Sequence, residues 1–322
     1  MTASPLQALA LHGGSGTLLR QDMSPELEYA YREALGSALS LGWGILAANG
    51  SALEAVQAVV EALEDCPLFN AGRGSVFTAE GKHEMDAAIM NGADRRAGAV
   101  AGIRLVRNPI QLARRVLERG EFVLLSGTGA EAFAREEGIA FAPESYFFTE
   151  LRHRQWLEAR ALERVVMDHD LPGKKFGTVG AVACDARGHI AAATSTGGLT
   201  GKRFGRIGDS PLIGSGTYAN DATCAVSCTG YGEEFIRGQA AYDVAARMEY
   251  LGESVATASR VVVHERLPRL NARGGLIAVD CRGNVSLPFN TEGMYRAWQR
   301  TGEVAKVQIY RDECTTESAL PH

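Results

Sequence analysis

Gly177 and Thr178 open the stretch "GTVGAVACD", in which a hydroxyl stands at the start of an apolar run. If the bond between them is cut, Thr178 carries both a hydroxyl and a free α-amino group. An α-amine has a pKa near ~8, so it can take the hydroxyl proton at neutral pH. One residue would then supply the nucleophile and the base of an acyl transfer. Glycine at 177 lets the peptide adopt the geometry in which the hydroxyl attacks its own preceding carbonyl.

Other polar residues stand where they could complete such a site. "ATSTGG" ends the next apolar run, and a tight turn would bring Thr196 beside Thr178. A glycine-rich loop carries Arg206 and Asp209, and "SCTGYGEE" ends a strand with Thr229 and turning backbone N–H groups, as in an oxyanion hole. Taken singly, each has an ordinary explanation, because threonine is common in strands and two charges three residues apart usually form a surface ion pair.

Caps, glycines and hydrophobic periodicity predict the elements that position these residues. We expect helices over 24–49, 51–64, 108–119, 233–252 and 253–267. We expect strands over 6–11, 97–106, 122–129, 221–230 and 306–310, and hairpins over 178–196 and 274–290. The first strand should stop at "HGGSG".

The two hairpins imply antiparallel pairing, which argues against a doubly wound parallel sheet. The sequence therefore predicts an α+β fold in which two antiparallel sheets are flanked by helices, within a single domain over 1–322. The charged stretch before the first hairpin is closed by "PG". We interpret 167–177 as an exposed, mobile linker.

Composition excludes several classes of protein. The chain has 322 residues, 46% of them hydrophobic, and a net charge of −5 with no basic stripe, so we expect no nucleic-acid partner. No apolar run reaches membrane-spanning length, and the N-terminus lacks the basic region of a signal peptide, which predicts a cytoplasmic protein. The six cysteines are sparse and have no zinc-ligand spacing, so we expect free thiols.

The motifs together resemble one known family. In order along nearly the whole chain they are "LHGGSG", "LEDCPLFNAGRGSVFT", "HEMDAAIMNG", "GTVGAVACD", "AATSTGG", "GRIGDSPLIGSGTYAN", "SCTGYGEEFIR" and "PFNTEGMYRAW". They resemble the plant-type L-asparaginases, or isoaspartyl peptidases, among the N-terminal nucleophile hydrolases. The resemblance implies an αββα sandwich, self-cleavage into an α chain 1–177 and a β chain 178–322, and a dimer of αβ heterodimers.

The resemblance also implies the catalytic roles. Thr178 would be the nucleophile, and Thr196 would hydrogen-bond that hydroxyl and its amine. Thr229 and the N–H of Gly230 would form the oxyanion hole. Asn70 stands where the family has an asparagine near the nucleophile. No catalytic cofactor is implied.

Substrate recognition follows from the same resemblance. Arg206 would pair with the substrate α-carboxylate, and Asp209, helped by the backbone near Gly232, would accept the α-ammonium. The substrate would then be L-asparagine or a β-aspartyl dipeptide, and the product L-aspartate. A structural sodium site built from backbone carbonyls is also implied, with the ligands Leu63, Glu64, Cys66, Phe69, Ala71 and Arg73.

Alternatives and departures accompany this interpretation. A glycosylasparaginase acting on aspartylglucosamine is one alternative, and an uncleaved, inactive aspartate-binding homologue is another. Arg73 stands where relatives have an apolar residue, Asn91 replaces a common aspartate, and Tyr231 occupies a variable position. His12 and His83 are candidate bases, but the α-amine makes a histidine unnecessary, and we expect both to be structural.

Overall fold

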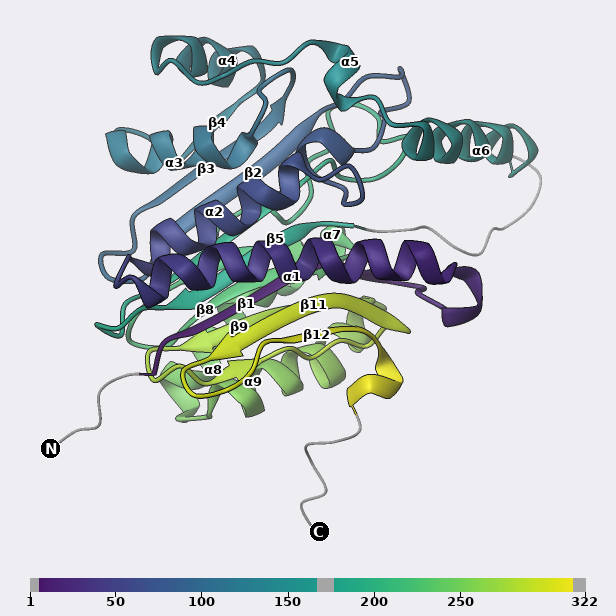
Figure 1. Ribbon diagram of the computed structural model, residues 1–322. Coiled ribbons are helices and arrows are strands. Elements are labelled where there is room, and N and C mark those ends of the chain that lie inside the picture. The colour runs from purple at the N-terminus through teal and green to yellow at the C-terminus, as the bar shows by residue number, and fades with distance from the viewer. Residues whose placement is uncertain (1–5, 167–176, 315–322) are drawn as a thin grey trace, which may run out of the picture.

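Two β-sheets lie face to face between two layers of helices in the computed structural model, which describes residues 6–166 and 177–314 (Figure 1). This is the predicted αββα sandwich, and the fold class is confirmed. The expected linker falls almost entirely at 167–176, outside the described residues. None of the described helices is long and apolar enough to cross a membrane.

The first sheet has eight strands, all paired antiparallel except β3 with β4. In spatial order they are β12 (Lys306–Tyr310), β11 (Gly293–Arg300), β1 (Ala8–Gly16), β5 (Val179–Cys184), β6 (Ile190–Thr196), β2 (Met85–Asn91), β3 (Ala97–Ile103) and β4 (Leu124–Ser126). The second sheet has four, in the order β10 (Val285–Ser286), β9 (Gly274–Asp280), β8 (Cys224–Gly230) and β7 (Thr217–Ala219).

Helices cover the outer face of each sheet. The first sheet carries α1 (Pro25–Ala47), α2 (Ala52–Asp65), α3 (Pro109–Arg119) and α4 (Gly127–Glu136), with α5 (Glu144–Phe147) and α6 (Glu150–Val166) at one end. The second carries α8 (Ala240–Leu251) and α9 (Val255–Val261), which continues as a π-helical turn over Val262–Arg266 and a 3₁₀ turn over Leu267–Leu270. Helix α7 (Gly232–Gly238) follows β8.

Helix α2 shows how the sequence fixes its own position. Ser51 Oγ accepts the N–H of Glu54 while the Glu54 carboxylate accepts the N–H of Ser51, a capping box that starts the helix. Val56, Val59 and Leu63 recur at helical spacing and are buried against the first sheet. Burial of each such side chain contributes roughly 1.5–3 kcal/mol to the free energy of unfolding. The end of α2 is thereby held where the loop carrying Asn70 begins.

Strand alternation separates two cores and decides which residues face the site. In β1, Leu9 and Leu11 pack in the core under the helices, whereas Ala8 and Ala10 pack in the core between the sheets. The same alternation in β6 turns Thr194 and Thr196 toward the inter-sheet space, since the intervening Ser195 hydrogen-bonds Glu64 of α2. Polar side chains on the inner face therefore meet between the sheets.

Several element boundaries differ from those predicted. Strand β1 does not stop at the glycines but continues to Gly16, with a bulge between His12 and Gly14. The helix expected over 233–252 is two helices, because Gln239 adopts a left-handed conformation with φ of 47°. Strands β2, β7 and β11 were not predicted.

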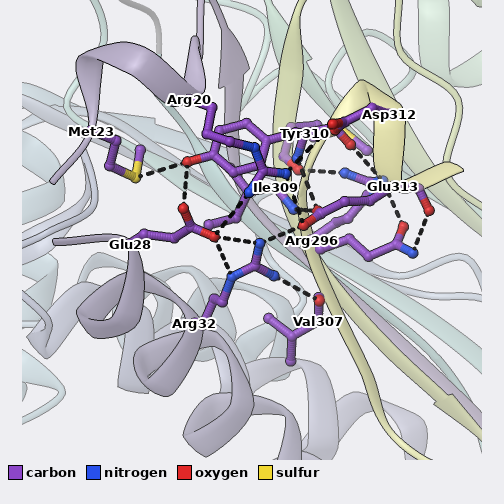
Figure 2. A network of polar contacts seen from close by, with 12 residues as sticks. Arg20, Met23, Glu28, Arg32, Arg296, Val307, Ile309, Tyr310, Asp312 and Glu313 are labelled. Atoms are coloured by element: carbon purple, nitrogen blue, oxygen red, sulfur yellow. Dashed lines mark hydrogen bonds and ion pairs between the residues drawn. The ribbon is translucent and has the colours of Figure 1, made fainter. Parts of the chain in front are cut away.

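The order of strands interleaves the two halves of the chain. Strand β5, which follows Thr178, pairs with β1 on one side and β6 on the other. Strand β2, which precedes Thr178 in sequence, pairs with β6. Figure 2 shows a further link, in which Arg32 of α1 donates to Glu313 near the end of the chain at 2.5 Å. The regions before and after residue 177 thus form one continuous structure.

Candidate active site

Thr178 lies at the start of β5 with its hydroxyl directed at the end of β6. Its Oγ1 donates to Thr196 Oγ1 at 3.2 Å, and Thr196 Oγ1 in turn donates to the carbonyl oxygen of Gly177 at 3.1 Å. Thr178 and Thr196 are both buried. The tight turn expected between the two strands therefore does bring the two threonines together.

The carbonyl of Gly177 is held by a second donor. Asn70 Nδ2 lies 2.8 Å from Gly177 O and 2.8 Å from Gly198 O, while Asn70 Oδ1 accepts the N–H of Val76 at 3.0 Å. With these contacts the amide has no freedom to rotate. A Cβ on Gly177 would lie 2.9 Å from Asn70 Cβ, so a side chain at 177 would push away the donor that holds its carbonyl. Close approach is thus one reason for glycine at this position.

His12 supports Thr178 from behind but is not placed to act as its base. His12 Nδ1 lies 3.0 Å from the Thr178 carbonyl oxygen, and Nε2 lies 3.0 Å from Ser227 Oγ. Burial lowers the pKa of His12 to about 3, so the ring is neutral and donates through Nδ1–H. His83 instead contacts Ser75. Both histidines have structural contacts, as predicted.

Arg206 forms an ion pair, though not with Asp209. Its Nε and Nη2 donate to the two carboxylate oxygens of Glu233, each at 2.8 Å. This is the two-pronged geometry that guanidinium offers any carboxylate. Glu233 stands in the first turn of α7 and is half exposed, so an incoming carboxylate can compete for the same donors. The simple surface pair between Arg206 and Asp209 is not found.

Asp209 is a buried carboxylate with an unused oxygen. The residue is 4% exposed, and Oδ2 has no hydrogen-bond partner among the described residues. Burial raises the pKa of Asp209 to about 7, against the opposing effect of its own backbone N–H and of Arg206. A Cβ on Gly232 would lie 2.7 Å from Arg206 Nη2 and 3.1 Å from Asp209 Oδ1. Gly232 therefore leaves the space between the two charges open.

Thr229 lies at the end of β8 with its hydroxyl oriented by Ser15. The N–H of Ser15 donates to Thr229 Oγ1 at 3.2 Å, and Ser15 Oγ donates to the Thr229 carbonyl at 3.0 Å. Since Thr229 Oγ1 accepts here, its own proton is directed elsewhere, as an oxyanion donor requires. Gly230 follows, packed so that a Cβ would meet Arg273 O at 2.6 Å.

One residue joins the two halves of this arrangement. The N–H of Gly198 donates to Thr196 Oγ1 at 2.9 Å, and a Cβ on Gly198 would lie 3.6 Å from Arg206 Nη1. Thr178, Thr196 and the charged groups of Arg206 and Asp209 therefore border the same space at one end of the two sheets. A hydroxyl with its own scissile carbonyl on one side and a cation and an anion on the other suits hydrolysis of an amide in an amino-acid-like substrate.

A family model described as asparaginase matches residues 5–309. The chain belongs to the asparaginase family. Its αββα fold is that of the N-terminal nucleophile hydrolases, and it is an amidohydrolase. Among the relatives of this asparaginase-family chain, the isoaspartyl peptidase of Salmonella typhimurium is 53% identical over 308 residues, covering 94% of this chain and 98% of the relative.

Two further relatives span the family. The isoaspartyl peptidase of Escherichia coli is 52% identical, covering 96% of this chain and 97% of its own length. The plant-type L-asparaginase of Pyrococcus abyssi is 43% identical, covering 92% and 97%. These proteins carry both names that the sequence motifs suggested.

The loop expected to bind sodium in this asparaginase-family chain is tightly folded around its carbonyls. A Cβ on Gly72 would lie 2.4 Å from Glu64 O, and one on Gly74 would lie 2.0 Å from Phe69 O. Arg73 directs its guanidinium over the ring of Tyr146, 5.6 Å from the ring centre, so its side chain is used outside the loop. The arginine at position 73 is therefore compatible with the close packing of the loop backbone, and the sodium site stays a prediction.

The other two departures lie at the ends of strands β2 and β8. Asn91 lies at the end of β2, where Nδ2 donates to Asp94 Oδ1 at 3.0 Å within a turn. Tyr231 precedes α7, and its N–H donates to Arg273 O at 3.2 Å.

Sequence reasoning assigned no role to several residues that support the site, although Ser15, Asp86 and Ser227 lie inside the matched motifs. Ser15 and Ser227 contact Thr229 and His12, and Asp86 and Lys202 are buried close to Thr196 and Gly198. Because "HGGSG" is typical of a turn, the sequence does not indicate that the strand continues through it and directs alternate side chains toward the space between the sheets. Lys202 follows a glycine-rich stretch, where an exposed lysine is the ordinary expectation.

Proposed function

We propose that this protein is an amidohydrolase, activated by its own cleavage at Gly177–Thr178, that releases L-aspartate from β-aspartyl dipeptides and L-asparagine. The observation that carries the proposal is the hydrogen-bonded series from Thr178 Oγ1 through Thr196 Oγ1 to Gly177 O. In this series Thr196 Oγ1 contacts both the hydroxyl of Thr178 and the carbonyl that this hydroxyl must attack to free the α-amine, which supports the proposal. The names of the relatives support the substrate class.

The chemistry proceeds by acyl transfer. After cleavage the Thr178 amine takes the proton of its own hydroxyl, and Oγ1 attacks the side-chain amide carbonyl of the substrate. Thr229 and the N–H of Gly230 stabilise the oxyanion, and ammonia or an amino acid leaves with the proton. Water then hydrolyses the β-aspartyl ester on Thr178, releasing aspartate.

Substrate selection rests on the two charges. Arg206 exchanges Glu233 for the α-carboxylate, and Asp209 accepts the α-ammonium with its unused Oδ2. An internal aspartyl residue offers neither free charge, which is why an amino-acid end is required.

A sodium ion accompanies this proposal as a structural element. The carbonyls of Leu63, Glu64, Cys66, Phe69, Ala71 and Arg73 would hold it, and the ion would fix the loop from which Asn70 reaches Gly177. It takes no part in the reaction. Exchanging sodium for choline should lower the melting temperature if the site is occupied, and an unchanged melting temperature would remove this element.

One assay separates the candidate activities. Purified protein is analysed by intact mass and N-terminal sequencing, then given β-aspartyl dipeptides, L-asparagine and aspartylglucosamine. We expect two chains, the second starting "TVGAV", and turnover of the first two substrates. Preference for aspartylglucosamine would favour a glycosylasparaginase, and a single chain that binds aspartate without turnover would favour an inactive binding protein.

A further inference from the structure

Three polar side chains lie side by side across neighbouring strands on the inner face of the first sheet. Thr178 directly precedes β5, Thr196 ends β6, and Asp86 stands in β2 directly opposite Thr196 in the antiparallel register. Directly opposed residues point to the same face, with Cβ atoms about 4.5–5.5 Å apart. Asp86 is therefore the next residue beyond Thr196, counted from the nucleophile.

The carboxyl group of Asp86 is only half used. The side chain is fully buried, and Oδ1 accepts the N–H of Gly102 at 2.8 Å. Oδ2 has no hydrogen-bond partner among the described residues. A buried carboxyl oxygen without a donor costs stability, so a role in chemistry is a reasonable explanation for its presence.

Charged groups from the surrounding segments face Asp86. Burial raises the pKa of Asp86 and Glu84 adds to this effect, against the opposing effects of Lys202, the Gly102 N–H and Arg206. Asp86 in turn raises the pKa of Asp209. Lys202 is itself buried, and its Nζ donates to Glu84 O at 2.8 Å. A Cβ on Gly198 would lie 3.2 Å from that Nζ, so the ammonium group lies beside Gly198, two residues after Thr196.

Self-cleavage requires a proton acceptor that hydrolysis does not. In the uncut chain the nitrogen of Thr178 is part of a peptide bond and cannot act as a base. His12 touches the Thr178 carbonyl rather than its hydroxyl. Thr196 Oγ1 accepts the hydrogen bond of the Thr178 hydroxyl, but a hydroxyl is too weak a base to keep that proton. The next group in the row is Asp86.

We propose that Asp86 accepts the proton of Thr178 during self-cleavage, through the hydroxyl of Thr196. This inference rests on the proposed function. As Oγ1 of Thr178 bonds to the Gly177 carbonyl carbon, its proton passes to Thr196, whose hydroxyl turns and gives its own proton to Asp86 Oδ2. Asn70 Nδ2 stays on the developing oxyanion.

The proton then returns to complete the reaction. When the bond from Gly177 carbon to Thr178 nitrogen breaks, Asp86 gives the proton back through Thr196 to that nitrogen, leaving an ester between Gly177 and Thr178 Oγ1. Water hydrolyses the ester to the Gly177 carboxylate and the Thr178 hydroxyl. Asp86 ends unchanged, and the mature enzyme uses the new amine instead.

The test compares cleavage with hydrolysis in the full-length chain. Freshly made wild type, Asp86→Asn and Asp185→Asn are incubated between pH 5 and 9, and the rate of appearance of the 178–322 chain is measured. Asp185 is a matched control, because it is buried on the same β5–β6 hairpin at the opposite end, where it accepts the N–H groups of Arg187 and His189.

We expect wild-type cleavage to quicken as pH rises through the titration of Asp86, because only the carboxylate accepts a proton. Asp86→Asn should cleave at least 10-fold more slowly, without that pH-dependent rise. The fraction that does cleave should hydrolyse β-aspartyl dipeptide with a KM close to that of wild type. Asp185→Asn should retain both the rate and the pH dependence.

Other outcomes overturn the inference. Cleavage of Asp86→Asn at the wild-type rate, or slow cleavage that keeps the pH-dependent rise, would show that Asp86 is not the acceptor while leaving the proposed function intact. If wild type itself stays uncut, the proposed function fails instead.

A second variant keeps the test decisive if Asp86→Asn does not fold. Lys202→Gln removes a cation that favours the carboxylate form of Asp86 and keeps a donor for Glu84 O. We expect its pH-dependent rise in cleavage to move to higher pH. A rise at the wild-type position would overturn the inference.

Discussion

Asp86 and Asp209 each keep one carboxyl oxygen without a hydrogen-bond partner among the described residues, and both lie close to the candidate site. Around them, Asn70, Thr196 and His12 are each held by hydrogen bonds to backbone groups, and Thr196 and His12 also bond the side chains of Thr178 and Ser227. The contrast indicates that Asn70, Thr196 and His12 fix the geometry of the site, whereas Asp86 and Asp209 each have a carboxyl oxygen available to bind a cation or a proton. Predictions at this scale concern Thr178, Asp209 and Arg206.

Replacing Thr178 tests the nucleophile. Thr178→Ala should abolish both self-cleavage and hydrolysis, because it removes the hydroxyl needed for each. Thr178→Ser keeps the hydroxyl and should retain measurable cleavage. Mass spectrometry of both variants checks this, and full activity of the alanine variant would rule out Thr178.

The pH dependence of substrate capture tests Asp209. Burial raises its pKa to about 7, so below that pH the carboxyl is protonated and cannot pair with the substrate ammonium. We expect kcat/KM for a β-aspartyl dipeptide to rise with pH through about 7, and Asp209→Asn to lose this rise. A kcat/KM profile for Asp209→Asn that matches wild type would assign the titration to another group.

Truncation of Arg206 tests carboxylate recognition. Hydrogen bonds to charged groups contribute about 1.5–3 kcal/mol, so Arg206→Ala should lower kcat/KM by roughly 10- to 150-fold. The loss should appear mainly in KM. The rate of self-cleavage above the titration of Asp86 should be unaffected, while its pH-dependent rise should move to higher pH, as for Lys202→Gln. Steady-state kinetics check this, with Arg237→Ala as a control on the same helix as Glu233, since the exposed Arg237 side chain pairs with Glu234. Unchanged kinetics for Arg206→Ala would remove its role.

At the scale of elements, the site depends on how closely β1, β5 and β8 approach. Gly180 of β5 lies under the contact between His12 and Ser227, and a Cβ there would fall 2.0 Å from Ser227 Oγ and 2.5 Å from His12 Nε2. Only a residue without a side chain allows the two sheets to share these hydrogen bonds. The inner face of β5 is therefore constrained at the position two residues beyond the nucleophile.

Gly180→Ala should destabilise the protein by about 1–3 kcal/mol, because the added methyl overpacks the inter-sheet core. It should also slow self-cleavage by displacing His12 from the Thr178 carbonyl. Thermal unfolding and a cleavage time course measure both effects. Gly44→Ala is the control, since a Cβ there meets nothing within 4 Å in helix α1, and it should be neutral or stabilising. A stable, normally cleaving Gly180→Ala would contradict this account.

Local signals predicted the elements whose ends carry caps or turns. The Ser24 and Ser51 caps marked α1 and α2, and the glycine turn at 188 marked the β5–β6 hairpin. Strands β2 and β11 were missed because "MDAAIMN" and "GMYRAWQR" lack a clean apolar alternation. Their pairing comes from the sheet around them, which no local pattern contains.

The candidate site divides in the same way. Thr178, Thr196, Arg206, Asp209 and Asn70 were found because whole motifs matched a family. Ser15, Asp86 and Lys202 act through contacts between segments far apart in sequence. The partner of Arg206 was also unpredictable, since Glu233 lies 27 residues away and is joined to it only by the fold.

At the scale of the whole molecule, the proposed cleavage would divide a sheet whose strands are paired across the cut. Strand β5 lies between β1 and β6, and β1 also pairs with β11. The contacts in Figure 2 add Glu28 of α1, which accepts the hydroxyl of Tyr310 at 2.9 Å. The regions before and after residue 177 both contribute side chains to the two cores.

The two chains should therefore stay together after cleavage. We expect cleaved protein to elute as one species from a native sizing column, with chains 1–177 and 178–322 in equal amounts, and to separate only in denaturant. Uncut Thr178→Ala under the same conditions is the control for size. Release of either chain without denaturant would mean that the strand pairing across the cut does not hold them.

The central position of β5 also means that the proposed cleaved form would depend on strand pairing that was made in the uncut chain. While the chain is whole, β1 and β5 are tethered, and they find each other at an effective concentration set by the connecting chain. Once the bond at 177 is gone, the same pairing is a meeting of two molecules and depends on how dilute they are. Under the proposed function, the cleaved enzyme would be assembled only once, from the uncut chain, and unfolding in dilute solution would remove the tether through which β1 and β5 first paired.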